Sequence, residues 1–229
     1  MLDKSEIEGI INNIGAKNSQ ADKIAEKDRN ILSIFKKNLD EAGDKEDIYD
    51  VSIDALSRFG YDFSFVAIFR DDRKYSTAMR IRVDSELVNR VEDYARKMMP
   101  DVTVMRYRIP IFEEGRLFRR FLLESKMPLV SENISISEPG KVIKASMNEI
   151  YDNLIAENSP LKLLIPAFKR MVPYKSAMSS HLFVGDIAIG NIGFGSKFVI
   201  PEETLDLLLI ISEMIGKKLN SIGFGKNYG

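Results

Sequence analysis

The chain has 229 residues, enough for one ample domain, and its 33 Lys and Arg balance 34 Asp and Glu, so no overall field would draw it to nucleic acid or to an anionic membrane. It contains no Cys, which excludes disulfides, thiolate nucleophiles, thiolate metal sites and covalent thioether attachment of a chromophore. Its longest unbroken apolar run, Leu207 to Ile211, is far shorter than the ~20 residues that a membrane helix needs, so we expect a cytoplasmic protein with neither nucleic acid nor a membrane as its partner.

The first forty residues are charged and have helical spacing. Two apolar stripes run through them, separated by the stretch GAKNSQ: Ile7, Ile10, Ile11 and Ile14, then Ile24, Ile31, Ile34, Phe35 and Leu39. We predict that residues 1–44 form a leading helical segment that serves dimerisation or signalling. A further helix is predicted from about Ile48 to Phe59, where Gly60 ends it.

A change of period then predicts the first strands. The run FSFVAIF, apolar throughout from Phe65 to Phe69, is typical of a central strand that is buried on both faces. After the turn DDRKYS, the run TAMRIRV alternates as expected of a second strand with one wetter face. A helix is predicted from Asp84 or Ser85 to Pro100, and VTVMRYRIPI returns to strand character.

The middle of the chain is predicted to be mostly helical. A short helix ends before Pro128, and a short extended piece follows over Leu129–Ser131. The stretch KASMNEIYDNLIAEN is interpreted as one helix, and Ser159-Pro160 caps another that runs through LKLLIPAFKRM. Because the segment between Ser131 and Pro173 is too apolar for a free loop, we expect it to cover one face of the sheet as a lid.

The C-terminal part is predicted to be a hairpin followed by a long helix. KSAMSSHLFV and IAIGNIGFG form the hairpin around a tight Gly185-Asp186 turn, and the helix runs from about Pro201 to about Ile222. Two opposite faces of this helix are apolar. One face can lie on the sheet, and the other needs a leading helix or a second copy of the chain for cover: Leu207, Ile210, Ile211 and Met214.

These elements together describe an α+β domain on an antiparallel sheet of about five or six strands. We expect the terminal helices on one face of the sheet, the helical lid on the other, and the Phe65–Phe69 strand in its interior. The domain would span residues 45–222, and a flexible tail would follow at 223–229.

The stretch HLFVGDIAIGNIGFGSKFVIPEETLDLL resembles the end of a GAF domain, the small-molecule-sensing relative of the PAS fold. Such domains end in a hairpin with a Gly-Asp or Gly-Gly turn, an iGvlgl-like strand, and a phenylalanine and an acidic pair that open the last helix. Upstream stretches extend the resemblance to roughly Asp47 to Ile222: DVSIDALSRFGYDFSFVAIF and YRIPIFEEGRLFRRFLLESKMPLVSENI. The segments Asp84 to Asp101 and Ile134 to Pro173 are longer than a compact GAF domain requires. The resemblance implies a GAF/PAS-like fold and a role in sensing.

The residues that carry chemistry favour binding over catalysis. The strand glycines Gly190, Gly193 and Gly195 are placed to admit a close backbone, helix or ligand rather than to cradle a phosphate. His181 is the single histidine and the chain has no G-x-S-x-G elbow, which disfavours a Ser-His-Asp triad, and a strand histidine is more often hydrogen-bonded than a haem ligand. The pairs Asp71-Asp72 and Glu113-Glu114 are expected to be solvated.

Two predicted strands each carry an Arg-x-Arg pattern, Arg80 with Arg82 and Arg106 with Arg108. If the two strands are adjacent, these side chains form a basic face for an anionic ligand. The alternative is a face whose arginines are solvated or paired with nearby acidic residues.

The sequence therefore predicts a non-catalytic sensory or regulatory domain. It would bind a small molecule between sheet and lid and transmit a signal, as a homodimer, through its terminal helices to an output domain or protein. The candidate ligand-binding residues are Tyr107, His181 and Phe183, with Arg106 and Arg108 as anion-binding candidates. No catalytic or metal-binding residue is assigned, and the cofactor is unknown. The alternatives are an enzyme or stand-alone binding protein that uses the same pocket, or a purely structural dimerisation module.

Overall fold

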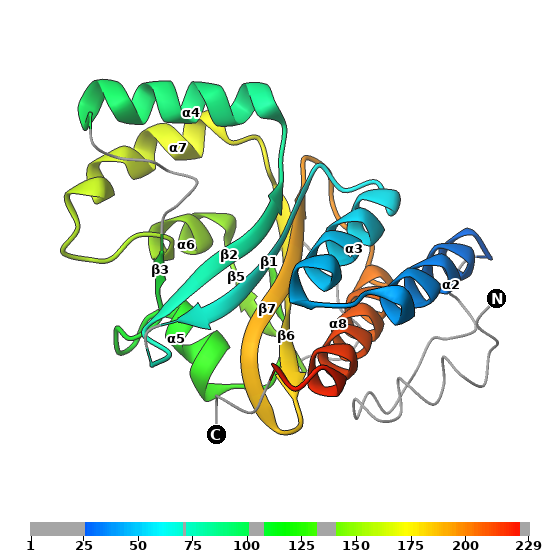
Figure 1. The fold of residues 1–229 in the computed structure, drawn as a ribbon. Coiled ribbons are helices and arrows are strands. Elements are labelled where there is room, and N and C mark those ends of the chain that lie inside the picture. Colours follow the sequence, from blue (N-terminus) through cyan, green and yellow to red (C-terminus); the bar gives the residue numbers. More distant parts are fainter. Residues whose placement is uncertain (1–25, 71, 101–107, 132–140, 225–229) are drawn as a thin grey trace.

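The computed structural model describes residues 26–70, 72–100, 108–131 and 141–224 (Figure 1). The predicted stripe from Ile7 to Ile14 lies outside the described residues, as does Ile24.

Within the described residues, seven strands form one sheet in the order β3-β2-β1-β7-β6-β4-β5. Their bounds are β1 Phe63–Arg70, β2 Tyr75–Arg82, β3 Ile109–Pro110, β4 Leu129–Ser131, β5 Ile143–Ala145, β6 Ser176–Val184 and β7 Ile187–Ser196. Neighbouring strands are antiparallel except for the short edge pair β4–β5, which is parallel. The α+β class is confirmed, and β1 lies in the interior between β2 and β7, as predicted. The sheet has one strand more than expected, because β5 begins where the sequence predicts a helix.

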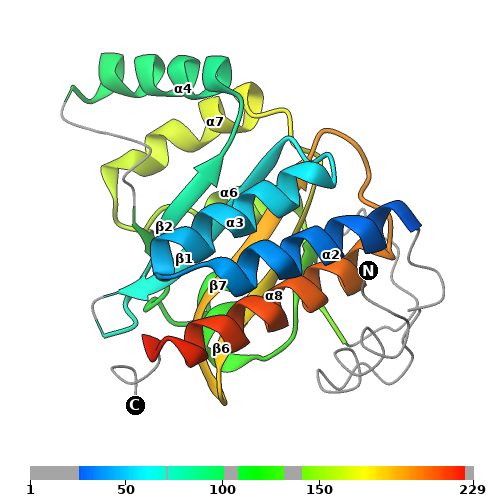
Figure 2. The same cartoon turned by 45° about the vertical axis from the view of Figure 1, so that its right-hand side comes forward.

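Of the helices in the described residues, three cover one face of the sheet: α2 Glu26–Glu41, α3 Lys45–Arg58 and α8 Thr204–Ser221. Figure 2 shows them lying side by side in front of the strands. The Asp44 carboxylate caps α3 by accepting hydrogen bonds from the backbone of Glu46 and Asp47, and Gly60 follows the helix with a φ of 87°. The predicted arrangement, with leading and closing helices on one shared face, is confirmed for the described helices.

Both apolar faces of α8 are buried within the chain. One face packs on β6, where Gly216 lets the helix approach so closely that an added Cβ would lie 2.2 Å from the Phe183 carbonyl oxygen. On the other side, α2 and α3 pack against α8, and α2 contributes Leu32 and Phe35 to the same core. The four residues of the second face are all buried: Leu207, Ile210, Ile211 and Met214. The sequence left two ways to cover this face, a leading helix or a second copy of the chain. In the structure, α2 and α3 of the same chain cover it.

Short helices form a lid over the opposite face of the sheet. Their bounds are α4 Ser85–Met98, α5 Leu117–Arg119, the π-helix η3 Arg120–Glu124, α6 Met147–Asn153, the 3₁₀ helix η4 Pro160–Leu164 and α7 Ile165–Met171. Figure 1 shows α4 and α7 together above one end of the sheet, with α6 and α5 lower down. The segment predicted to form the lid does so through α6, η4 and α7. Because α4 packs on α7, and α5 and η3 continue the layer, the lid is larger than predicted.

Candidate functional site: a cavity between sheet and lid

A cavity of about 340 Å³ lies between the sheet and the lid. This volume lies within the range of small-molecule sites, about 300–1,000 Å³. The sheet side is formed mainly by β1, β2, β6 and β7, and the lid side by α4, η3, α6, η4 and α7. Most lining residues are aromatic or aliphatic: Phe63, Phe65, Ile81, Val83, Leu87, Val91, Phe118, Phe121, Leu122, Met147, Ile150, Leu154, Ile155, Leu161, Leu164, Phe168 and Val172 among them.

The space exists because small residues stand on the lid-facing side of four strands. These are Ala67 of β1, Ala78 of β2, Ala177 of β6 and Gly195 of β7, all of which line the cavity. Gly193 has a different role, since an added Cβ would lie 2.6 Å from the Met178 carbonyl oxygen and 2.9 Å from the Phe65 ring. Gly190 is equally tight, with the Ala67 carbonyl oxygen 2.1 Å from an added Cβ. The prediction that these strand glycines serve close packing therefore holds for Gly190 and Gly193.

A short polar chain crosses the floor of this apolar cavity. The Ser76 hydroxyl donates to Asn191 Oδ1 at 3.3 Å, and Asn191 Nδ2 donates to the Ser179 hydroxyl at 3.0 Å. Ser179 donates in turn to the carbonyl oxygen of Ile192 at 3.1 Å. The three side chains come from β2, β7 and β6, are all buried, and line the cavity. None of the three was among the predicted site residues, although an Asn within the apolar run IAIGNIGFG was a usable signal for a buried polar site.

Two tyrosines add polar groups to the lining. Burial raises the pKa of Tyr151 to about 12, and burial with the nearby carboxylates Asp62 and Asp84 raises the pKa of Tyr174 to about 12. Both phenols are therefore neutral at pH 7. The Tyr151 hydroxyl donates to the backbone carbonyl of Tyr174 at 3.4 Å. The Tyr174 hydroxyl is buried and has no hydrogen-bond partner among the described residues.

The lid is held together by Arg116, whose side chain is only 16% exposed. It donates to the side chain of Asn153 at 3.0 Å and to the backbone carbonyl of Ile155 at 2.9 Å, and pairs with Glu113 at 3.1 Å. These bonds tie the segment before α5 to the end of α6. Glu113 was predicted to be solvated, and this is a correction: its carboxylate is largely buried because it pairs with Arg116 and caps the backbone of Glu157.

The predicted ligand residues His181 and Phe183 lie on the lid-facing side of β6 but do not line the cavity. His181 is 2% exposed, lies 4.6 Å from the Phe121 ring between ring centroids, and shares a hydrogen bond of 2.8 Å between Nε2 and the Phe121 carbonyl. Burial lowers its pKa from 6.5 to about 4. The imidazole is therefore neutral at pH 7, donates from Nε2, and packs beneath η3 beside Phe183.

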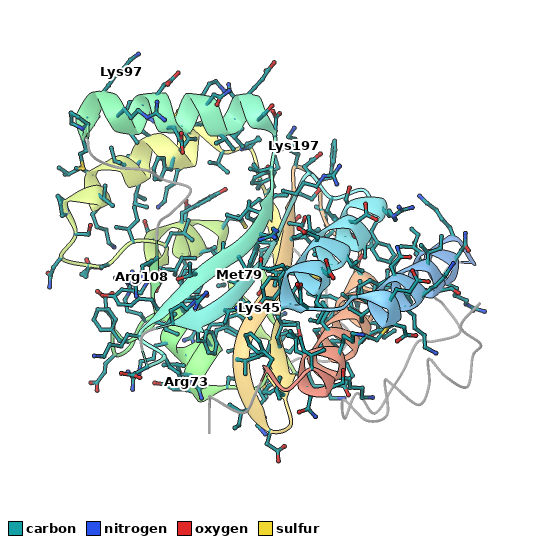
Figure 3. All side chains as sticks on the ribbon, viewed as in Figure 1. Lys45, Arg73, Met79, Lys97, Arg108 and Lys197 are labelled. Carbon is teal, nitrogen blue, oxygen red and sulfur yellow. The ribbon has the colours of Figure 1, made fainter. Side chains whose placement is uncertain are left out.

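The predicted arginines do not gather in the described structure. Arg106 and Tyr107 lie outside the described residues. Arg108 is exposed, and its guanidinium carbon lies 4.2 Å from the centre of the Tyr75 ring (Figure 3). Arg80 pairs with Asp50 and Glu46 of α3 on the opposite face of the sheet, which matches the salt-bridged alternative rather than an anion site.

The described residues lack two other kinds of feature. No group of three or more His, Asp or Glu side chains in this part of the chain is placed to hold a metal ion. No described helix is both long and apolar enough to cross a membrane.

Neither a family model nor a curated protein matches the sequence. The fold, however, is similar to solved structures of bilin-bound GAF domains. The phycoerythrobilin-bound GAF domain of a cyanobacterial phytochrome aligns with a TM-score of 0.55 and 12% identity over 87% of this chain and 98% of that one. The phycocyanobilin-bound GAF domain of a cyanobacterial phytochrome aligns with a TM-score of 0.55 and 11% identity over 88% of this chain and 98% of that one. JSC1_58120g3 with bound biliverdin aligns with a TM-score of 0.52 and 14% identity over 84% of this chain and 99% of that one. The chain therefore has the GAF fold, as its sequence resemblance implied.

Proposed function

We propose that this chain is a non-catalytic sensory or regulatory domain that binds a small apolar molecule in the cavity between sheet and lid. The observation that carries the proposal is the cavity itself, which an otherwise well-packed domain maintains with small residues on four strands. Its described lining supplies little for acid–base catalysis. The two tyrosines are neutral at pH 7, and the Glu92 carboxylate pairs with Arg96 at 2.9 Å.

The two central strands also suggest how binding would be transmitted. On β6, Ser179 lines the cavity while the next residue, Ser180, contacts Ser212 of α8 at 3.2 Å between hydroxyl oxygens. A ligand that shifts β6 would therefore act directly on the closing helix. The proposal keeps a homodimer and an output partner, but the contact would use the ends and outer surfaces of the terminal helices, because the inner faces of α8 are already covered.

Two observations argue against the bilins of the structural neighbours as ligands of this cavity. The sequence has no Cys for a thioether bond. Bilins carry carboxylate side chains, and the described lining residues include no Lys, Arg or His to neutralise them. We therefore look for a ligand of other chemistry.

A direct test is to fill the cavity. Ala78→Leu combined with Ala177→Leu places two larger side chains into the open space, whereas Ala167→Leu makes the same change on α7 at a residue that does not line the cavity. Binding would be followed with the fluorescent apolar probe 1-aminoanthracene, and native mass spectrometry would show any molecule retained through purification.

The wild type and Ala167→Leu should bind the probe and gain thermal stability, by about 2.7 kcal/mol at a hundredfold excess over Kd. The filled variant should fold and lose binding. If the filled variant binds like the wild type, the cavity is not the site. If the wild type binds no probe and retains no molecule, the domain is a structural module.

A further inference from the structure

The charges around the cavity limit the kind of molecule that it can accept. Among the described lining residues there is one carboxylate, Glu92, and no cationic side chain. Glu92 already pairs with Arg96. From the described lining residues, a carboxylate or phosphate ligand would therefore gain no counter-ion in return for its lost hydration. The lining favours an uncharged molecule.

The polar chain on the floor has unused hydrogen-bonding capacity. Asn191 uses one of its two side-chain N–H donors on Ser179, and its Oδ1 accepts one bond, from Ser76. One N–H and one lone pair of the amide therefore remain. A hydroxyl group can accept from the first and donate to the second, whereas a halide or an alkyl group satisfies neither donor nor acceptor well. Asn191 is only 6% exposed, so a molecule bound in the cavity would shield these remaining hydrogen bonds from bulk water.

The separation of Asn191 and the Tyr174 ring along β7 indicates an elongated shape. Tyr174, with its unpartnered hydroxyl, packs beside Gly195, where an added Cβ would lie 3.7 Å from the Tyr174 ring. Gly195 and Asn191 are four residues apart on β7, which corresponds to roughly 13 Å at about 3.3 Å per residue. Between these two points the sheet side of the lining is formed by Phe65 of β1 and by Ser179 of β6, whose hydroxyl already belongs to the polar chain at Asn191.

We propose that the cavity takes an elongated, uncharged, largely apolar molecule whose hydroxyl group is hydrogen-bonded to Asn191. This inference rests on the proposed function and specifies its ligand class. The hydroxyl of the ligand joins the hydrogen bonds that link Ser76, Asn191 and Ser179, and its apolar body extends along β7 towards Tyr174.

Three ten-carbon molecules test the two parts of this inference at pH 7.5, each by displacement of 1-aminoanthracene. 1-Decanol carries the hydroxyl, 1-chlorodecane lacks it, and decanoate replaces it with a charge. 1-Decanol should bind about tenfold more tightly than 1-chlorodecane, because it gains one or two buried hydrogen bonds. It should bind at least about tenfold more tightly than decanoate, because the charge has no counter-ion.

Two variants sharpen the comparison. Asn191→Leu should remove the preference of 1-decanol over 1-chlorodecane and keep the rejection of decanoate. Ser180→Ala changes the neighbouring serine, which lies on the opposite face of β6, and leaves the hydrogen bonds of Asn191 intact. This variant should bind the three molecules like the wild type. If Asn191→Leu does not fold, the three wild-type affinities still decide the question.

Decanoate binding as tightly as 1-decanol would overturn the assignment of an uncharged ligand. Equal affinities for 1-decanol and 1-chlorodecane in the wild type would overturn the hydroxyl. Either result with 1-aminoanthracene bound leaves the proposed function standing. Failure of all four molecules to bind would overturn this inference, and if no molecule is retained through purification either, it would overturn the proposed function as well.

Discussion

The two faces of the sheet are packed in different ways. On the helix face, α2, α3 and α8 form one large core with the strands, and the crevice between α2 and α3 beside Ala55 is too narrow to admit a water molecule. On the lid face, two smaller clusters stand apart and leave about 340 Å³ between them. The same strands supply both faces, because successive side chains point to opposite sides.

The difference lies in the residues that alternate along each strand. On β1, Val66 and Ile68 belong to the core of the helix face, while Ala67 between them lines the cavity. On β7, Ile192 and Phe194 fill the helix face, while Asn191 lies on the cavity floor. Large side chains on one side therefore provide stability, and small or polar ones on the other leave room for a ligand.

The largest expected effect comes from breaking the helix face at its centre. Ile211 is fully buried between the sheet and α2 and α3, so Ile211→Asp would bury an unpaired carboxylate and should lower the free energy of unfolding by about 4 kcal/mol or more. Urea denaturation would measure this. Ile34→Asp, on the exposed side of α2, should cost about 1 kcal/mol or less. A stable Ile211→Asp would mean that α2 and α3 do not cover this face in solution.

The second-largest loss of stability is expected where α8 packs on β6. Gly216→Ala would place a Cβ 2.2 Å from a backbone oxygen, which a rotamer change cannot relieve. We expect a loss of about 3 kcal/mol despite the better helix propensity of alanine. Gly43→Ala is the matched control, since its nearest contact would be the Asp47 carboxylate at 3.6 Å. Similar melting temperatures for the two variants would contradict the close packing of the helix face.

His181 tests a closely packed part of the lid face, where the imidazole is buried beneath η3. Its pKa is about 4 in the folded chain and 6.5 ordinarily, so its contribution to stability is complete above pH 6.5. As pH falls from 6.5 to 4, the unfolded chain takes up a proton that the folded chain does not, and stability is lost. Between pH 7 and pH 5 this loss is about 2 kcal/mol. His181→Gln keeps a donor for the Phe121 carbonyl and does not titrate, so its unfolding free energy should lack this loss. If the unfolding free energies of the wild type and His181→Gln depend on pH in the same way, His181 is not buried.

Much of this architecture could be predicted from local patterns in the sequence. The apolar run from Phe65 to Phe69 predicted an interior strand, and the two apolar faces of the last helix predicted cover on both sides. The Gly185-Asp186 turn also forms as predicted, with a φ of 59° at the glycine. These features depend on residues near one another in the chain, so period and turn chemistry are sufficient to find them.

The cavity could be predicted only in outline, because it depends on contacts between distant segments. Strand alternation placed His181 and Phe183 on the lid face, but alternation does not tell which part of that face η3 covers. The ligand role of these residues stays a prediction. Ser76 and Ser179 lie on different strands, and only the order of the strands in the sheet brings both to Asn191. The strand β5 escaped prediction because Lys144 and Ala145 were assigned to the helix that follows, which begins only at Met147.

The smallest expected effect compares one substitution on the two faces. Ala177→Leu adds atoms to the open cavity and should change the free energy of unfolding by less than about 1 kcal/mol, because the new side chain meets empty space and buries apolar surface. Ala55→Leu makes the same change on α3, where the alanine is 2% exposed and the neighbouring crevice has no accessible volume, and should cost about 2 kcal/mol. Urea denaturation of both variants in ligand-free buffer measures the difference. Equal costs would mean that the lid closes onto the sheet in solution, so that the cavity is not maintained and the distinction between the two faces is lost.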